Sequence, residues 1–156
     1  MKKGILAKNA TLRDILDGEV LTGSRLESAA YGLQICHAIG EAFPDSELTG
    51  GARGMAKQAM LHNRWLSDPH RWPPAAKPGA SWHHFLVVTG GTRGAIDIDI
   101  PGRNPDTWAI PALRALQAKN LKVHLILTEG GRKGYNHFQW LFGGGAKGNP
   151  GNVKAI

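Results

Sequence analysis

The stretch that decides the fold is Ser81–Ile100, which reads SWHHFLVVTGGTRGAIDIDI. In its last six residues, isoleucine alternates with alanine and two aspartates, and this period of two predicts a β-strand. The three isoleucines share the face that packs on a core, so Asp97 and Asp99 face a cleft or solvent. Two adjacent histidines, His83 and His84, precede this strand. The stretch therefore brings together four side chains that can ligate a metal ion.

Three further strands are predicted around this one. LKVHLILT at 121–128 and YNHFQWLF at 135–142 are rich in β-branched and aromatic residues, and the segment EGGRKG between them suits a hairpin. Alternation in the second of these strands places His137 on the face opposite Phe138. HHFLVV at 83–88 is also predicted to be a strand, which the glycine-rich turn TGGTRG connects to AIDIDI.

Helical signals precede the predicted sheet. Apolar residues recur at helical spacing, and capping or breaking residues stand at the expected ends. The predicted helices lie between Thr11 and Gly18, over 25–43, over 54–66, and from Asn104 and Pro105 onward with a kink at Pro111. This order predicts an α+β fold, in which N-terminal helices pack on a small, mainly antiparallel sheet that carries the functional site.

The chain of 156 residues has the length of one domain. We expect residues 1–142 to form a single catalytic-type domain, and the glycine-rich segment 143–156 to be a flexible tail. Cys36 is the only cysteine, so an intrachain disulfide and a cysteine-rich zinc finger are excluded. We expect the protein to be a monomer.

Charge and hydropathy restrict the partners and the location. The formal net charge is +7, which favours anionic polymers such as nucleic acid or the cell wall. The basic residues are scattered and match no motif that reads DNA or RNA, so nucleic acid is not the expected partner. No apolar run approaches the ~18–20 residues of a membrane span, and the start lacks a signal-peptide core. We therefore expect synthesis in the cytosol and no membrane association.

Two imidazoles and one carboxylate form a common catalytic zinc site, with a fourth position left for water. His83 and His137 with Asp97 provide this set if their strands lie side by side. The residues alone leave two alternatives open. His84 can replace His83, and Asp99 can replace Asp97 or orient one of the histidines.

Three blocks of the chain resemble those of the zinc peptidases that cut bacterial peptidoglycan stem peptides. This family includes D-alanyl-D-alanine carboxypeptidases and dipeptidases, and phage L-alanyl-D-glutamate endopeptidases. Its first block, G-Y-R-x4-Q-x2-L, is matched by GARGMAKQAML at 51–61. Its second, S-x-H-x2-G-x-A-x-D, is matched by SWH at 81–83 and AID at 95–97. Its third, of the form W-H-F-x, is matched by NHFQ at 136–139.

The resemblance implies a function as well as a site. His83, Asp97 and His137 match the Zn²⁺ ligands, and the spacing within the second block favours the first two over their alternatives. Arg53 matches an arginine that holds a substrate carboxylate or a polarised carbonyl. Ser81 matches a position that supports the site. The implied activity is that of a zinc metallopeptidase of the phage endolysin type, which hydrolyses peptidoglycan after release through a holin or delivery by a virion.

The chain departs from the family pattern at two points. The gap between His83 and Asp97 is 14 residues, against 7 in the pattern, and we expect a longer hairpin to absorb the difference. The catalytic acid of the family lies three residues before the last histidine, where this chain has Gly134. On the predicted hairpin Glu129 lies diagonal to His137, with about 7–8 Å between Cα atoms. We therefore predict that Glu129 is the general base.

Two other functions are weighed against this one. A catalytically inactive relative would keep the fold and serve as a structural or assembly protein. A basic nucleic-acid-binding protein would use the glycine-rich turns that carry arginine and lysine, TRG and GRKG. Elemental analysis with a hydrolysis assay separates the first from a peptidase, and the salt dependence of binding tests the second.

Overall fold

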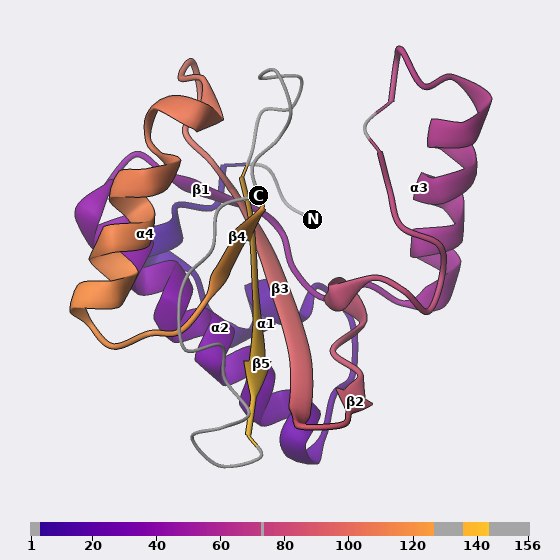
Figure 1. Ribbon diagram of the computed structural model, residues 1–156, viewed down its shortest axis with the longest axis horizontal. Helices are drawn as coiled ribbons and strands as arrows, with labels where there is room; N and C mark the ends of the chain where they lie inside the picture. Colours follow the sequence, from indigo (N-terminus) through magenta and orange to yellow (C-terminus); the bar gives the residue numbers. More distant parts are fainter. Residues whose placement is uncertain (1–3, 73, 127–135, 144–156) are drawn as a thin grey trace.

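The computed structural model describes residues 4–72, 74–126 and 136–143. These residues form an α+β fold, as predicted, with four α-helices, three 3₁₀ helices and five strands (Figure 1). The helices are η1 (Ala7–Asn9), α1 (Leu12–Leu16), α2 (Gly23–Ala42), α3 (Met55–Ser67), η2 (Trp82–His84), η3 (Pro105–Thr107) and α4 (Ala109–Ala118). The strands are β1 (Glu47–Gly50), β2 (Val87–Val88), β3 (Gly91–Asp99), β4 (His124–Ile126) and β5 (Asn136–Phe142).

The sheet is antiparallel throughout and is built around β3. Its order is β1-β3-β5-β4, and β2 pairs with the start of β3. Because β5 occupies one edge of β3, β1 and β2 lie along the other edge, at opposite ends of it. The register places Asp97 directly opposite His137 on β5 and opposite Gly50 on β1. The AIDIDI segment therefore belongs to the central strand, which starts at Gly91, within the segment TGGTRG that was predicted to be a turn.

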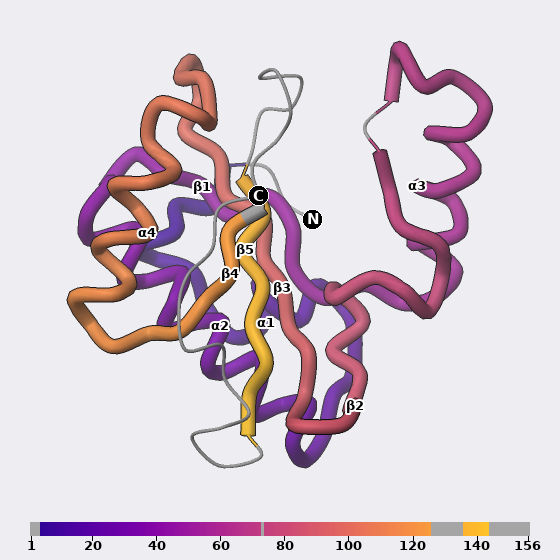
Figure 2. The backbone as a smooth tube through the Cα atoms, viewed as in Figure 1, coloured from indigo at the N-terminus to yellow at the C-terminus, as the bar shows by residue number. Residues whose placement is uncertain are grey.

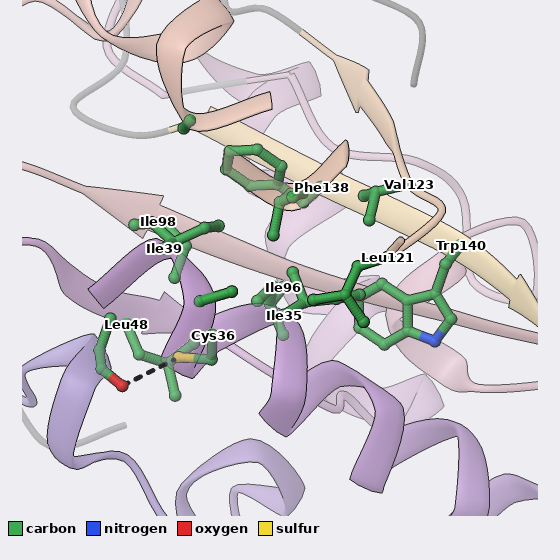
Figure 3. Packing of buried hydrophobic residues seen from close by; sticks show 14 of the residues in the cluster. Ile35, Cys36, Ile39, Leu48, Ile96, Ile98, Leu121, Val123, Phe138 and Trp140 are labelled. Carbon is green, nitrogen blue, oxygen red and sulfur yellow. Dashed lines mark hydrogen bonds between the residues drawn. The ribbon is translucent and has the colours of Figure 1, made fainter. Parts of the chain in front are cut away.

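One face of the sheet packs on α2 and α4 and forms the core. The isoleucines of β3 and the aromatic residues Phe138 and Trp140 of β5 are fully buried on this face. Figure 3 shows them against Ile35 and Ile39 of α2. The predicted alternation in both strands is confirmed, and the opposite face of the same strands is left for polar side chains.

Two glycines allow α2 and β3 to approach the Trp140 indole closely. A Cβ atom at Gly32 would lie 2.6 Å from the ring, and one at Gly94 would lie 2.4 Å from it. The indole Nε1 donates a hydrogen bond to the Ser28 hydroxyl at 3.0 Å. Trp140 therefore fixes the distance between the helix and the sheet.

The prediction of a strand over 83–88 is wrong. Trp82–His84 form a 3₁₀ helix, and only Val87–Val88 pair with β3. The Ser81 hydroxyl caps the turn by accepting a hydrogen bond from a backbone N–H. Arg25 of α2 donates hydrogen bonds to the backbone carbonyl oxygens of His84, at 2.8 Å, and Phe85, at 2.9 Å, where the 3₁₀ helix ends. These contacts from distant residues override the strand propensity of the segment.

Two further element predictions change. The sequence LTGG at 48–51 is typical of a turn, whereas its first three residues belong to β1, which pairs with β3. Asn104 caps a 3₁₀ helix through its Oδ1, which accepts from the N–H of Asp106, and α4 starts only at Ala109. Pro111 consequently lies in the first turn of α4, where proline interrupts no helical hydrogen bond and causes no kink.

The pairing of β4 with β5 agrees with the predicted hairpin. Its connecting residues 127–135 and the expected flexible tail from 144 onward lie outside the described residues. Among the helices that the structure does describe, none has the length and apolar character that crossing a membrane requires.

The helix α3 and the segment that follows it extend away from the sheet (Figure 2). We refer to the described residues from 55 to 80 as the α3 arm. The returning segment is bound to the helix by side chains. The Gln58 amide donates to the Ala76 carbonyl at 2.8 Å, and the His62 Nδ1 lies 2.7 Å from the Ala75 carbonyl. The arm is thus held largely by its own contacts.

Candidate metal centre

Three side chains from separate segments converge beside the central strand. His83 comes from η2, Asp97 from β3 and His137 from β5. Each offers a ligand atom, and these atoms all lie within 4.8 Å of one another. The two imidazole rings meet edge to face, with 5.1 Å between their centroids. This group could hold a metal ion.

The Asp97 carboxylate lies at the centre of the group. One of its oxygens, Oδ2, accepts a hydrogen bond from Arg53 Nη2 at 2.9 Å and lies 3.3 Å from His83 Nε2. The other, Oδ1, lies 3.0 Å from His137 Nδ1. Asp97 and His83 are each 3% exposed, whereas the side chain of His137 is 21% exposed. The site is therefore closed on one side and open towards His137.

His83 is held in one orientation by the backbone. Its Nδ1 lies 2.7 Å from the Gly51 carbonyl oxygen, and a carbonyl can only accept, so Nδ1 carries the hydrogen. Burial, with a further contribution from the Arg53 charge, lowers the pKa of His83 to about 4, although Asp97 opposes this shift. At neutral pH the imidazole is therefore neutral, and Nε2 presents a lone pair towards Asp97.

The carboxylate itself stays ionised. Burial alone would raise the pKa of Asp97, but the hydrogen bond from the His137 ring holds it well below its ordinary value, and the Arg53 guanidinium also donates to it at 2.9 Å. An anionic oxygen and the lone pair of His83 thus face each other at 3.3 Å with no hydrogen between them. Two such acceptors repel unless a cation or a proton lies between them.

His137 completes the set. Its Nδ1 points to Asp97, and its Nε2 lies 2.9 Å from the Gln139 Oε1. A neutral imidazole has one hydrogen, so only one of these oxygens receives a hydrogen bond from it. When Nε2 donates to Gln139, Nδ1 becomes a second lone pair beside the carboxylate. Metal-binding histidines commonly donate their outer N–H in this way, and the donor set fits a divalent cation.

The structure separates the two histidines that the sequence left open. His84 Nδ1 lies 2.8 Å from the Arg53 carbonyl oxygen, and its Nε2 accepts a hydrogen bond from Gly79 N–H at 2.9 Å. Both ring nitrogens are therefore occupied by the backbone. His84 connects the segment of Arg53 to the end of the α3 arm, and His83 is the histidine in the metal-binding group.

Asp97 is likewise distinguished from Asp99. Asp99 lies opposite Glu47 at the end of β3 and is outside the group of ligand atoms. Its partial burial and the neighbouring Glu47 charge raise its pKa. Asp99 lies two residues from Asp97 on the same strand but outside the metal-binding group, so its substitution is a suitable control for that of Asp97.

Arg53 connects the metal-binding group to an open hollow of about 470 Å³. Its guanidinium donates to Asp97 and also to the Gln58 side chain, and its side chain is 17% exposed. Arg53 lines the hollow together with Gly50, Gly51 and Lys57. The resemblance implies that Arg53 contacts the substrate. In the structure Arg53 also contacts Asp97.

Two contributors to the site were missed from the sequence. A Cβ atom at Gly50 would lie 2.6 Å from Asp97 Oδ2, so this position must be glycine for the carboxylate to keep its place. Gln139 contacts His137 from two residues further along β5, where strand alternation puts both side chains on one face. The alternation was a signal that could have identified Gln139. No comparable pattern pointed to Gly50.

The predicted general base, Glu129, lies outside the described residues. Within the described part of the chain, Asp97 is the one acid in the metal-binding group. Comparison with known proteins assigns no family, because no family model, no curated protein and no solved structure matches the chain.

The first prediction concerns metal binding. Asp97→Asn and His137→Ala each remove one ligand, and we expect the affinity for Co²⁺, used as a spectroscopic probe of a divalent site, to fall at least about 100-fold. Asp99→Asn, which removes the same charge from the same strand, should leave the affinity unchanged. An equal loss in the Asp99 variant would show that the site does not depend on this geometry.

The second prediction concerns the pH dependence of folding in the presence of a chelator. The pKa of His83 is about 4 in the folded protein and ~6.5 in the unfolded chain, so between these values only the unfolded chain binds the proton. The free energy of unfolding should therefore fall as the pH decreases from ~6.5 to ~4, by on the order of 3 kcal/mol. The lowered pKa of Asp97 adds to the loss at lower pH.

Urea unfolding at several pH values checks this dependence. His83→Gln should make the free energy of unfolding less dependent on pH in this window, because glutamine does not titrate. His70→Gln changes an exposed histidine and should keep the wild-type dependence. The same slope in wild type and His83→Gln would contradict the burial of a neutral His83.

Proposed function

We propose that this protein is a zinc-dependent peptidase that cleaves peptide bonds in bacterial peptidoglycan stem peptides. The observation that carries the proposal is the convergence of His83, Asp97 and His137. These residues belong to two separate sequence blocks that match the zinc peptidases, and their ligand atoms lie within 4.8 Å of one another. The remaining block, GARGMAKQAML at 51–61, supplies Arg53, which contacts the same carboxylate.

Zinc is the proposed metal because of the donor types. Two imidazoles and one carboxylate are typical of catalytic zinc sites that keep a position open for water or substrate. The exposure of His137 and the hollow next to Arg53 are consistent with such a position. Bound zinc lowers the pKa of water and polarises a carbonyl group as a Lewis acid.

The residues of the chain then have distinct tasks. The Gly51 carbonyl and Gln139 fix the orientations of the two histidines by accepting their outer N–H groups. Arg53 holds the carboxylate in place and extends to the edge of the hollow. In this position its guanidinium can donate to an oxygen of a bound peptide as negative charge develops on it.

The choice of substrate has separate support. The three blocks resemble enzymes that act on stem peptides, and the net charge of +7 suits an anionic wall. The lining of the hollow that borders the site carries both charges, from Arg53 and Lys57 and from Asp17 and Glu47. Such a lining fits a peptide that carries both carboxylate and amino groups, as stem peptides do.

The third prediction tests this activity. Zinc-loaded wild-type protein should release peptides from purified peptidoglycan, with mass spectrometry to identify the bond. His137→Ala should reduce the rate at least about 100-fold, and Asp99→Asn should retain it. If the folded, zinc-loaded protein leaves peptidoglycan intact, the peptidase proposal fails, and a metal-binding relative with a structural role becomes the better account.

The fourth prediction concerns the general base. Glu129→Gln should lower kcat by about 10²–10⁴-fold, since a positioned base contributes this much, while zinc content and KM change little. Steady-state kinetics together with elemental analysis provide the measurement. An unchanged kcat would assign proton abstraction to another group and would leave the metal site as it stands.

A further inference from the structure

The α3 arm carries a strong excess of positive charge. Between residues 55 and 80 the sequence has four lysines and arginines and a single acidic residue, Asp68. The Asp68 carboxylate accepts a hydrogen bond from the backbone N–H of Arg71 at 3.2 Å. One acid for four cations leaves most of this charge uncompensated along a segment that extends into solvent (Figure 1).

Two of the arginines share one aromatic ring. The guanidinium carbon of Arg64 lies 4.3 Å from the centre of the Trp72 ring, and that of Arg71 lies 4.9 Å from it. The two like charges are consequently within roughly 9 Å of each other, where they repel. Within the described residues neither guanidinium forms a salt bridge with a carboxylate. Arg64 Nη2 donates a hydrogen bond to the Met60 sulfur at 3.8 Å. Stacking holds each planar group while its other N–H donors stay available for an anion.

These arginines continue a row that starts at the metal centre. Lys57 and Arg64 are seven residues apart, which places them on the same side of α3 with a rise of about 10 Å between them. Lys57 lines the hollow beside Arg53, where it forms an exposed ion pair with Asp17 at 3.3 Å. We call Lys57, Arg64 and Arg71 the cationic row.

We infer that the cationic row binds an extended phosphodiester polyanion, of the poly(glycerol phosphate) type found in bacterial cell walls. Planar guanidinium groups match phosphate oxygens in pairs, and a row of cations suits a chain with repeated charges. The choice of a wall polymer rests on the proposed function. The binding itself requires neither the metal ion nor hydrolysis.

Two other classes of ligand fit less well. Single-stranded nucleic acid is usually bound by free aromatic faces on which bases stack, whereas the Trp72 ring already has two guanidinium groups over it. A membrane surface requires a continuous apolar face. The large exposed apolar residues of α3 are Met55, Met60 and Leu66. Met60 lies about 140° around the helix from Met55, and Leu66 lies on the side of Met55 but about 16 Å further along, so they form no continuous face.

The fifth prediction is a binding measurement on metal-free protein with purified poly(glycerol phosphate) as the probe. Arg64→Gln and Arg71→Gln should each weaken binding by about five- to tenfold and lower the salt dependence by about one counterion. Arg114→Gln removes the same charge from an exposed position on α4, distant from α3, and should change binding less than twofold. If Arg114→Gln weakens binding as much as the other two substitutions, binding depends on net charge and not on the cationic row, and the proposal is overturned.

Substitution of Trp72 distinguishes binding by the stacked arginines from binding by net charge alone. Trp72→Ala keeps every charge but removes the ring, and it should weaken binding several-fold, whereas Trp72→Phe should restore most of it. Tighter binding of single-stranded DNA, with a preference among bases, would overturn the wall polymer in favour of a nucleic acid. The binding assay contains no metal ion, so its result does not depend on hydrolysis. If the protein binds the polymer but the zinc-loaded protein leaves peptidoglycan intact, only the proposed peptidase function is contradicted.

Discussion

The buried charge of Asp97 is the constraint on which the rest of the site depends. An ionised carboxylate inside a protein costs several kcal/mol unless charged or hydrogen-bonding partners surround it. Here the Arg53 guanidinium and the His137 ring contact the carboxylate, and the neutral His83 ring lies 3.3 Å from it, each from a different segment of the chain. Folding therefore brings these segments together around one charge. Because the neutral His83 cannot donate to it, the same arrangement could hold a metal ion.

The central strand serves the core and the site at once. Its isoleucines are buried against α2, and on the opposite face the alternation presents Asp97 to β5 and η2. Glycines on α2, β3 and β1 make this compatible with close packing. Gly32 and Gly94 admit the Trp140 indole on the core side, and Gly50 admits the carboxylate on the other. A change in the packing of β3 would thus be transmitted directly to the metal-binding group.

Strand alternation allowed much of this to be predicted from the sequence. It identified the second half of β3 and the core face of β5, whereas the pairing that puts Asp97 opposite His137 became known only from the structure. It failed where distant contacts determine the backbone, as at η2, where Arg25 holds a turn in a segment with strand propensity. It also could not assign β1, since four residues that end in glycine resemble a turn until their partner strand is known. The choice of His83 over His84 follows only from the structure, where His83 Nε2 faces Asp97 and His84 Nε2 accepts a hydrogen bond from Gly79 N–H.

Anomalous diffraction at the zinc edge, from crystals of the zinc-loaded protein, tests the central claim most directly. The account predicts one strong peak per chain, bounded by His83 Nε2, an Asp97 oxygen and His137 Nδ1, with each bond at about 2.0–2.2 Å. A peak at any other position, or none beside an Asp97 carboxylate that still contacts both histidines directly, would contradict it.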